Sequence, residues 1–179
     1  MARAALSFSV ALVAGLALAQ GVDPGGGPGV PQGWVRYVNT AHRYVLWHPH
    51  DWEPQTLDNH SLYKFRVAGG EGRDFSVMYT PGADRLSLEE MFQGWRPNLA
   101  SAEGARYLLD RVRERKLGAN RALEIPMAPA GQYQATLWLV DVGGQKYGIL
   151  AQTGRADATV RQVLASLRKH PQAAPTPGP

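Results

Sequence analysis

The sequence contains no cysteine. This absence excludes disulfides, a thiol nucleophile, an iron–sulfur centre and a lipid-modified cysteine. If the protein is exported, core packing alone must hold it together. A chain of 179 residues with 44% hydrophobic residues is long enough for one such core and too short for two ordinary domains.

Long apolar runs are also missing, except at the N-terminus. Arg3 precedes an apolar run over residues 4–18, and small residues stand before Gln20. This order predicts a cleaved signal peptide over residues 1–19. The alternative, a retained membrane anchor, is disfavoured because the run is shorter than the ~20 residues that a span needs. We therefore expect a periplasmic or extracellular protein with no transmembrane helix in the mature chain.

The charge is modest, with a formal net charge of +4. That excess does not predict nucleic-acid binding, which needs a concentrated basic patch. The basic residues are mainly arginine, which indicates a GC-rich genome and is compatible with a thermophilic source.

Composition divides the chain into three further parts. Glycine and proline dominate residues 20–33, which predicts a flexible linker. Residues 34–169 carry the patterns of a single domain. Residues 170–179 are rich in proline and predict a disordered tail.

Alternating apolar and polar residues predict an antiparallel sheet. Gly143-Gly144 gives the strongest hairpin signal, because glycine adopts positive φ at little steric cost. The expected strands are Trp34–Asn39, Tyr44–His48, Ser61–Val67, Phe75–Thr80, Arg121–Pro126, Tyr133–Val142 and Gln145–Gln152.

Two helices are expected. Ser87 and Glu90 form a capping box ahead of an apolar stripe that Pro97 should end. The second helix, with Asp157 as a candidate cap, ends near Arg168 and Lys169, whose charges suit the helix dipole. The stripes of the two helices are Leu88, Met91, Phe92 and Trp95, and Val160, Val163, Leu164 and Leu167.

The segment Ala105–Leu117 fits either a helix or an edge strand. Strands, a helix, more strands and a closing helix together predict an α+β sandwich, in which helices flank an antiparallel sheet.

The stretch Thr40–Pro54, TAHRYVLWHPHDWEP, resembles the opening of PsbP-like and DcrB-like domains. The capping box at Ser87, the step Leu117–Ala122, the hairpin at Gly143-Gly144 and the helix ending in Ala165–Leu167 continue the resemblance. It extends from about Trp34 to Leu167.

This resemblance implies an α/β/α sandwich used for binding or assembly and not for catalysis. PsbP is an extrinsic subunit of photosystem II, and DcrB-like members are bacterial envelope proteins. The segment Gln55–His60 departs from the family pattern, so no site residue is carried over.

We expect a non-enzymatic domain that docks an envelope protein or a small ligand through its aromatic and histidine-rich loop. The candidate binding residues are Trp47, His48, His50, Asp51, Trp52 and His60.

The alternative is a metal-binding protein or a metal-dependent hydrolase. His48, His50 and Asp51, with His60 or His42, offer ligands for Zn(II), Cu(II) or Ni(II). The simpler interpretation is a polar loop in which His48 is partly buried and bonded to a backbone carbonyl. On that interpretation, which we favour, there is no cofactor.

Basic residues are densest between Arg106 and Lys116, where Asp110 and Glu114 offset them. This run could meet an acidic partner, an anionic polymer or lipid headgroups. A solvated face is the simpler interpretation.

Overall fold

The computed structural model describes residues 30–55, 62–66, 74–80, 82–102, 106–128, 135–152 and 158–170. The predicted signal peptide and most of the predicted linker and tail lie outside the described residues. No helix in the described ranges is long and apolar enough to cross a membrane.

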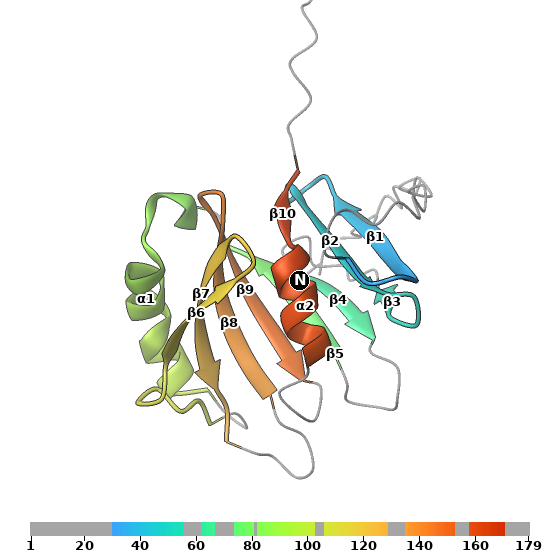
Figure 1. Ribbon diagram of the computed structural model, residues 1–179. Coiled ribbons are helices and arrows are strands. Elements are labelled where there is room, and N and C mark those ends of the chain that lie inside the picture. Colours follow the sequence, from blue (N-terminus) through green and yellow to red (C-terminus); the bar gives the residue numbers. More distant parts are fainter. Residues whose placement is uncertain are drawn as a thin grey trace, which may run out of the picture.

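The fold has three layers, with a large antiparallel sheet in the middle (Figure 1). Helix α1 (Leu88–Ala100) covers one face of this sheet. Helix α2 (Ala158–Ser166) and a small second sheet cover the other face. The arrangement confirms the predicted α+β class, in which helices flank antiparallel strands.

The large sheet has the strand order β3-β4-β5-β9-β8-β7-β6. The sequence predicted all of these strands except β3, with β6 as one of two alternatives. Their bounds are β3 Glu53–Gln55, β4 Leu62–Arg66, β5 Asp74–Tyr79, β6 Arg113–Leu117, β7 Asn120–Pro126, β8 Ala135–Val142 and β9 Gln145–Gln152.

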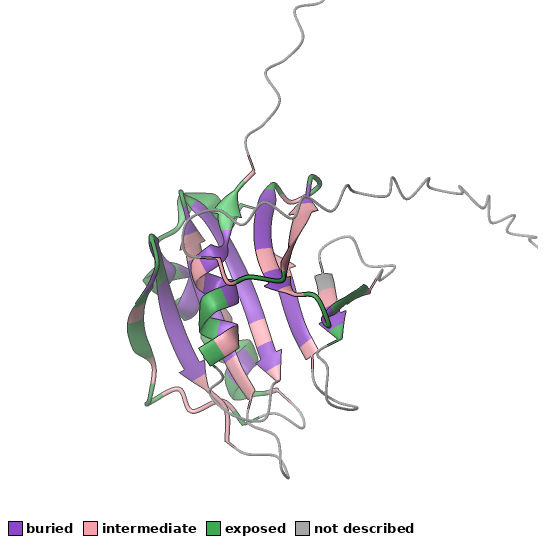
Figure 2. Cartoon of the chain, turned by 45° about the vertical axis from the view of Figure 1, so that its right-hand side comes forward, coloured by how far each residue is buried: buried purple, intermediate pink, exposed green. Residues whose placement is uncertain are grey.

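Strand β8 shows why the middle layer is buried on both faces (Figure 2). Leu137 and Leu139 pack in the cluster under α1, whereas Trp138 and Val140 pack in the cluster under α2. Successive side chains of a strand point to opposite faces, so an uninterrupted apolar run serves both clusters. The turn to β9 is closed by Gly143 and Gly144, both at positive φ, as predicted.

The small sheet has the order β1-β2-β10 and was not predicted as a separate unit. The hairpin of β1 (Trp34–Asn39) and β2 (Tyr44–Pro49) agrees with the sequence prediction. Arg168–Lys169, expected only to complement the helix dipole, forms β10 beside β2. Arg168 also donates a hydrogen bond to the carbonyl oxygen of Leu167, next to the end of α2.

Helix α1 starts at the predicted capping box. The Glu90 N–H donates to Ser87 Oγ at 3.1 Å, and the Ser87 N–H donates to Glu90 Oε2 at 2.7 Å. The prediction that Pro97 ends the helix is wrong, because the helix continues to Ala100. Proline removes a single N–H from the ladder. The last helical turn, which follows Pro97, is anchored by the buried side chain of Leu99.

The ambiguous segment 105–117 is not helical where it is described. Tyr107 forms an isolated bridge with Met127, and the Leu108 N–H donates to the Pro126 carbonyl oxygen at 2.8 Å. Strand β6 then pairs with β7 through a two-residue turn. Gly118 occupies the first turn position at φ 61°, the conformation that a type II′ turn requires there.

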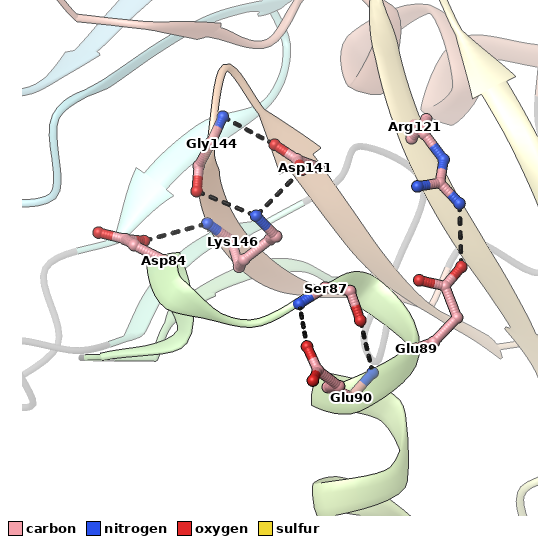
Figure 3. A network of polar contacts seen from close by, with 8 residues as sticks. All are labelled: Asp84, Ser87, Glu89, Glu90, Arg121, Asp141, Gly144 and Lys146. Atoms are coloured by element: carbon pink, nitrogen blue, oxygen red, sulfur yellow. Dashed lines mark hydrogen bonds and ion pairs between the residues drawn. The ribbon is translucent and has the colours of Figure 1, made fainter.

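A short 3-10 helix, η1 (Ala83–Arg85), precedes α1. A network of polar contacts joins η1 and the start of α1 to the large sheet (Figure 3). The Lys146 N–H donates to Asp84 Oδ1 at 3.3 Å, and Arg121 pairs with Glu89 at 2.9 Å.

Candidate functional site

The predicted binding loop connects the two sheets. Strand β2 belongs to the small sheet and ends at Pro49, and β3 begins the large sheet at Glu53. The Trp52 N–H donates to the Pro49 carbonyl oxygen at 3.1 Å, which closes a turn between them. The loop is therefore short and tied at both ends by strand pairing.

His48 lies inside the core and not on the loop surface. Only 3% of the residue is exposed, and its ring centroid lies 5.0 Å from that of Phe65. Its Nδ1 lies 2.7 Å from the Pro49 carbonyl oxygen, so Nδ1 carries the proton in this hydrogen bond. This agrees with the simpler interpretation of His48 as a buried ring bonded to a backbone carbonyl.

Burial also sets the protonation of His48. Desolvation lowers the pKa of the ring below its ordinary value, and the Pro49 hydrogen bond and the charge of Asp51 oppose that shift. The neutral imidazole is therefore favoured in the folded protein.

Trp52 is also part of the core. It is 4% exposed, and its ring centroid lies 5.3 Å from that of Phe75 in β5. The expectation of an exposed aromatic at this position is wrong. Burial of its large ring between the sheets stabilises the loop and leaves no face of Trp52 for a partner.

Trp47 is half-buried and lies beneath a cation. The Arg36 guanidinium carbon lies 6.0 Å from the centroid of the Trp47 ring, at the outer limit of a cation–π contact. The indole Nε1 of Trp47 is buried and has no hydrogen-bond partner among the described residues. Side chains alternate along β2, so Trp47 points away from the core that holds His48.

The predicted ligands that the structure describes do not form a metal site with His48. His50 and Asp51 are exposed, and His60 lies outside the described residues. His42 lies at the other end of β2 and stacks on Tyr79, with ring centroids 5.1 Å apart. In the described ranges, no group of three histidine or carboxylate residues could hold a metal ion.

The sequence analysis missed a polar cluster around Lys146. Only 4% of Lys146 is exposed, yet its Nζ lies 3.0 Å from Asp141 Oδ2 and donates to the Gly144 carbonyl oxygen at 3.0 Å. The Gly144 N–H donates to Asp141 Oδ1 at 2.8 Å (Figure 3). These bonds hold the β8–β9 hairpin together. The sequence signal for this cluster was Asp141, which stands two residues before the glycine pair and can accept a hydrogen bond from the turn backbone.

Two tyrosines lie near this cluster. The Tyr147 hydroxyl donates to the His42 carbonyl oxygen at 2.8 Å, and burial is the largest of the effects that raise its pKa. The Tyr79 hydroxyl donates to Asp84 Oδ2 at 3.4 Å. Burial, together with the Asp84 carboxylate, raises the pKa of Tyr79. Both hydroxyls therefore remain protonated at neutral pH and act as hydrogen-bond donors.

A shallow cavity of about 240 Å³ lies beside α2. It is smaller than the ~300–1,000 Å³ typical of small-molecule sites. Its lining includes Val30, Pro31, Gly118, Gln162, Ala165 and Arg168.

No protein-family model and no curated protein matches the sequence. The structure is similar to the solution structure of cyanobacterial PsbP (CyanoP) from Synechocystis sp. PCC 6803, with a TM-score of 0.54 and 14% sequence identity. The similarity covers 82% of this chain and 98% of that chain. Identity at this level carries the fold and no site residue. The predicted resemblance is therefore confirmed for the fold, and this chain has a PsbP-like fold.

Proposed function

We propose that the protein is an exported, non-enzymatic binding or assembly domain of the bacterial cell envelope. The observation that carries this proposal is the PsbP-like fold, shared over 98% of the solved cyanobacterial chain. The family resemblance implies use as a binding or assembly module. The N-terminal pattern of residues 1–19 supports export.

Part of the predicted loop forms the proposed docking surface. His50 and Asp51 are exposed in the turn after β2, and Trp47 lies on the outer side of the same strand beneath Arg36. His48 and Trp52 support this surface from inside the core. A half-buried tryptophan next to exposed charged and polar groups is the composition of many protein interfaces.

Site-specific photo-crosslinking in the cells that produce the protein tests this proposal. A photoreactive residue at His50 should give a discrete crosslinked product in the envelope fraction. The matched control is Gln93, which is exposed on α1 in the opposite layer. Equal products from both positions, or none from His50, would contradict the docking surface.

The same sample tests export separately. We expect the N-terminus of the purified mature protein to begin near Gln20. An intact Met1 in a cytoplasmic fraction would contradict export without bearing on the docking surface.

A further inference from the structure

Strand β6 forms one outer edge of the large sheet. In the described part of the chain it pairs with β7 and with no other strand. Four of its five residues, Arg113 to Lys116, are exposed or half-buried. The opposite edge strand, β3, has three residues and includes Pro54, which has no N–H to offer. Of the two edges, β6 is thus the one suited to pairing.

The turn to β7 fixes which backbone groups of β6 are open. Leu117 pairs with Asn120 across a two-residue turn, so this closing pair exchanges hydrogen bonds. Hydrogen-bonded and non-bonded positions alternate in an antiparallel pair. Lys116 and Glu114 therefore turn their N–H and carbonyl groups away from β7, toward the open edge.

The side chains along this edge are mainly cationic. Residues 106–117 contain five basic and two acidic residues, a net charge of +3. Arg115 pairs with Glu124 at 2.6 Å, and Glu114 pairs with Arg121 at 2.8 Å. The remaining cations have no ion pair within the described ranges; they are Arg106, Arg111, Arg113 and Lys116.

The unpaired cations lie on both faces of the edge. Lys116 shares a face with Glu114, which is joined through Arg121 to Glu89 of α1. Arg113 shares the opposite face with Leu117, which packs in the cluster under α2. An added strand would therefore meet a positive charge on each of its faces.

The charge pattern selects among the possible occupants of the edge. A second copy of β6 would bring one cationic strand against another, and like charges on adjacent strands are destabilising. Anionic lipid or polysaccharide would satisfy the charges and leave the amide ladder unused. An acidic polypeptide satisfies both the cations and the open backbone groups.

We propose that β6 accepts an extended, acidic segment of a partner protein as an additional strand of the large sheet. This goes beyond the proposed function, because β6 and the β1–β2 hairpin lie on opposite sides of the molecule (Figure 1). The edge carries a preformed strand, open backbone groups and unpaired cations. Its charges also protect it from pairing with itself.

The test uses the full chain and a short capped peptide of valine, threonine and glutamate. Hydrogen exchange followed by NMR should show slower exchange of the Glu114 and Lys116 amides when the peptide is added. A peptide of the same sequence with N-methylated backbone has the same charge and cannot pair. We expect it to give no protection at these two amides.

Protein variants test the charge and the backbone separately. Charge reversal by Arg113→Glu with Lys116→Glu should weaken peptide binding about tenfold or more, because two attractive pairs become repulsive. Arg161→Glu, an exposed change on α2, is the matched control and should leave binding unchanged. Lys116→Pro removes the outward N–H and should weaken binding more than Lys116→Gln does.

Several outcomes would overturn the proposal. Equal binding of the N-methylated peptide would show that charge alone is recognised. Protection of the same amides without peptide, together with a dimer in sedimentation, would identify a second copy as the occupant. Binding to vesicles with anionic lipids and to no peptide would indicate a membrane surface. These results are independent of the His50 crosslinking experiment, so a failure of the β6 proposal is distinguishable from a failure of the docking surface.

Discussion

The hydroxyl of Ser166 in α2 holds the backbone of Trp47 in β2. The Trp47 N–H donates to Ser166 Oγ at 3.0 Å, and that oxygen lies 3.2 Å from the Trp47 carbonyl oxygen. The hydroxyl also lies 2.6 Å from the Val163 carbonyl oxygen. One side chain thus joins the last helix to the strand that leads into the candidate binding loop.

Replacing Ser166 with alanine should destabilise this junction. The part-buried Trp47 N–H would lose its partner, which costs about 1–3 kcal/mol for a fully buried donor and sets the upper limit here. We expect the free energy of unfolding in urea to fall by about 1–2 kcal/mol. Ser101→Ala removes an exposed hydroxyl at the end of α1 and is the matched control, with an expected change within about 0.5 kcal/mol. If Ser166→Ala lowers the free energy of unfolding no more than Ser101→Ala does, the Ser166 contact does not stabilise the junction.

Trp95 of α1 closes over Gly148 of β9. A Cβ atom at Gly148 would lie 2.9 Å from Trp95 Cζ3 and closer still to Cη2. Gly148→Ala should therefore push α1 away from the sheet and lower the free energy of unfolding by about 1–3 kcal/mol.

Gly94 provides the matched control for this change. It lies on the exposed side of α1, and a Cβ there would meet nothing within 4 Å. Gly94→Ala should raise the free energy of unfolding by about 0.5–1 kcal/mol, since alanine is the better helix former. Thermal unfolding measures both variants. A stabilised Gly148→Ala would contradict the packing argument.

Local features were predictable from the sequence because nearby residues determine them. The capping box of Ser87 and Glu90 needs only its own turn of helix, and Gly143-Gly144 needs only its own hairpin. The alternation of β4 and β5, and the hairpin pattern of β8 and β9 around the glycine pair, were visible for the same reason. The fold class followed from the order of these elements.

Features that depend on distant partners were not predictable. Arg168 and Lys169 become a strand only because β2 offers its edge. Pairing with β7 makes residues 113–117 a strand, and the periodicity of the segment 105–117 does not reveal that pairing. The sequence shows that residue 52 is a tryptophan but not whether it is buried. Its burial depends on contact with Phe75 of β5, 23 residues further along the chain. The candidate site differs most from the prediction. Its residues lie between the two sheets, so their burial depends on strands that are distant in the sequence.

His48 should make stability depend on pH. The folded ring has a pKa below the ordinary 6.5, chiefly because of burial. Below pH 6.5 the unfolded chain therefore binds more protons than the folded protein. The contribution of His48 is present above pH 6.5 and is lost as the pH falls through the lowered folded pKa.

Urea unfolding at several pH values measures this dependence. We expect the wild type to lose stability on acidification below about pH 6.5. His48→Gln should have a flatter profile there, whatever its absolute stability, and a parallel profile above that pH. Parallel profiles throughout would show that the buried ring does not couple to folding.

Metal binding at the histidine loop remains a testable alternative. A His48 ligand would have to act from inside the core, where Nδ1 is already bonded to the Pro49 carbonyl oxygen. His50 is exposed, so it would supply a single ligand of the kind that binds metals weakly. We expect native mass spectrometry of the untagged mature protein to show no stoichiometric Zn(II), Cu(II) or Ni(II) after their addition. A bound metal that disappears in the His48→Ala, His50→Ala double variant would contradict this expectation. That result would establish the loop as a metal site and reopen the question of catalysis.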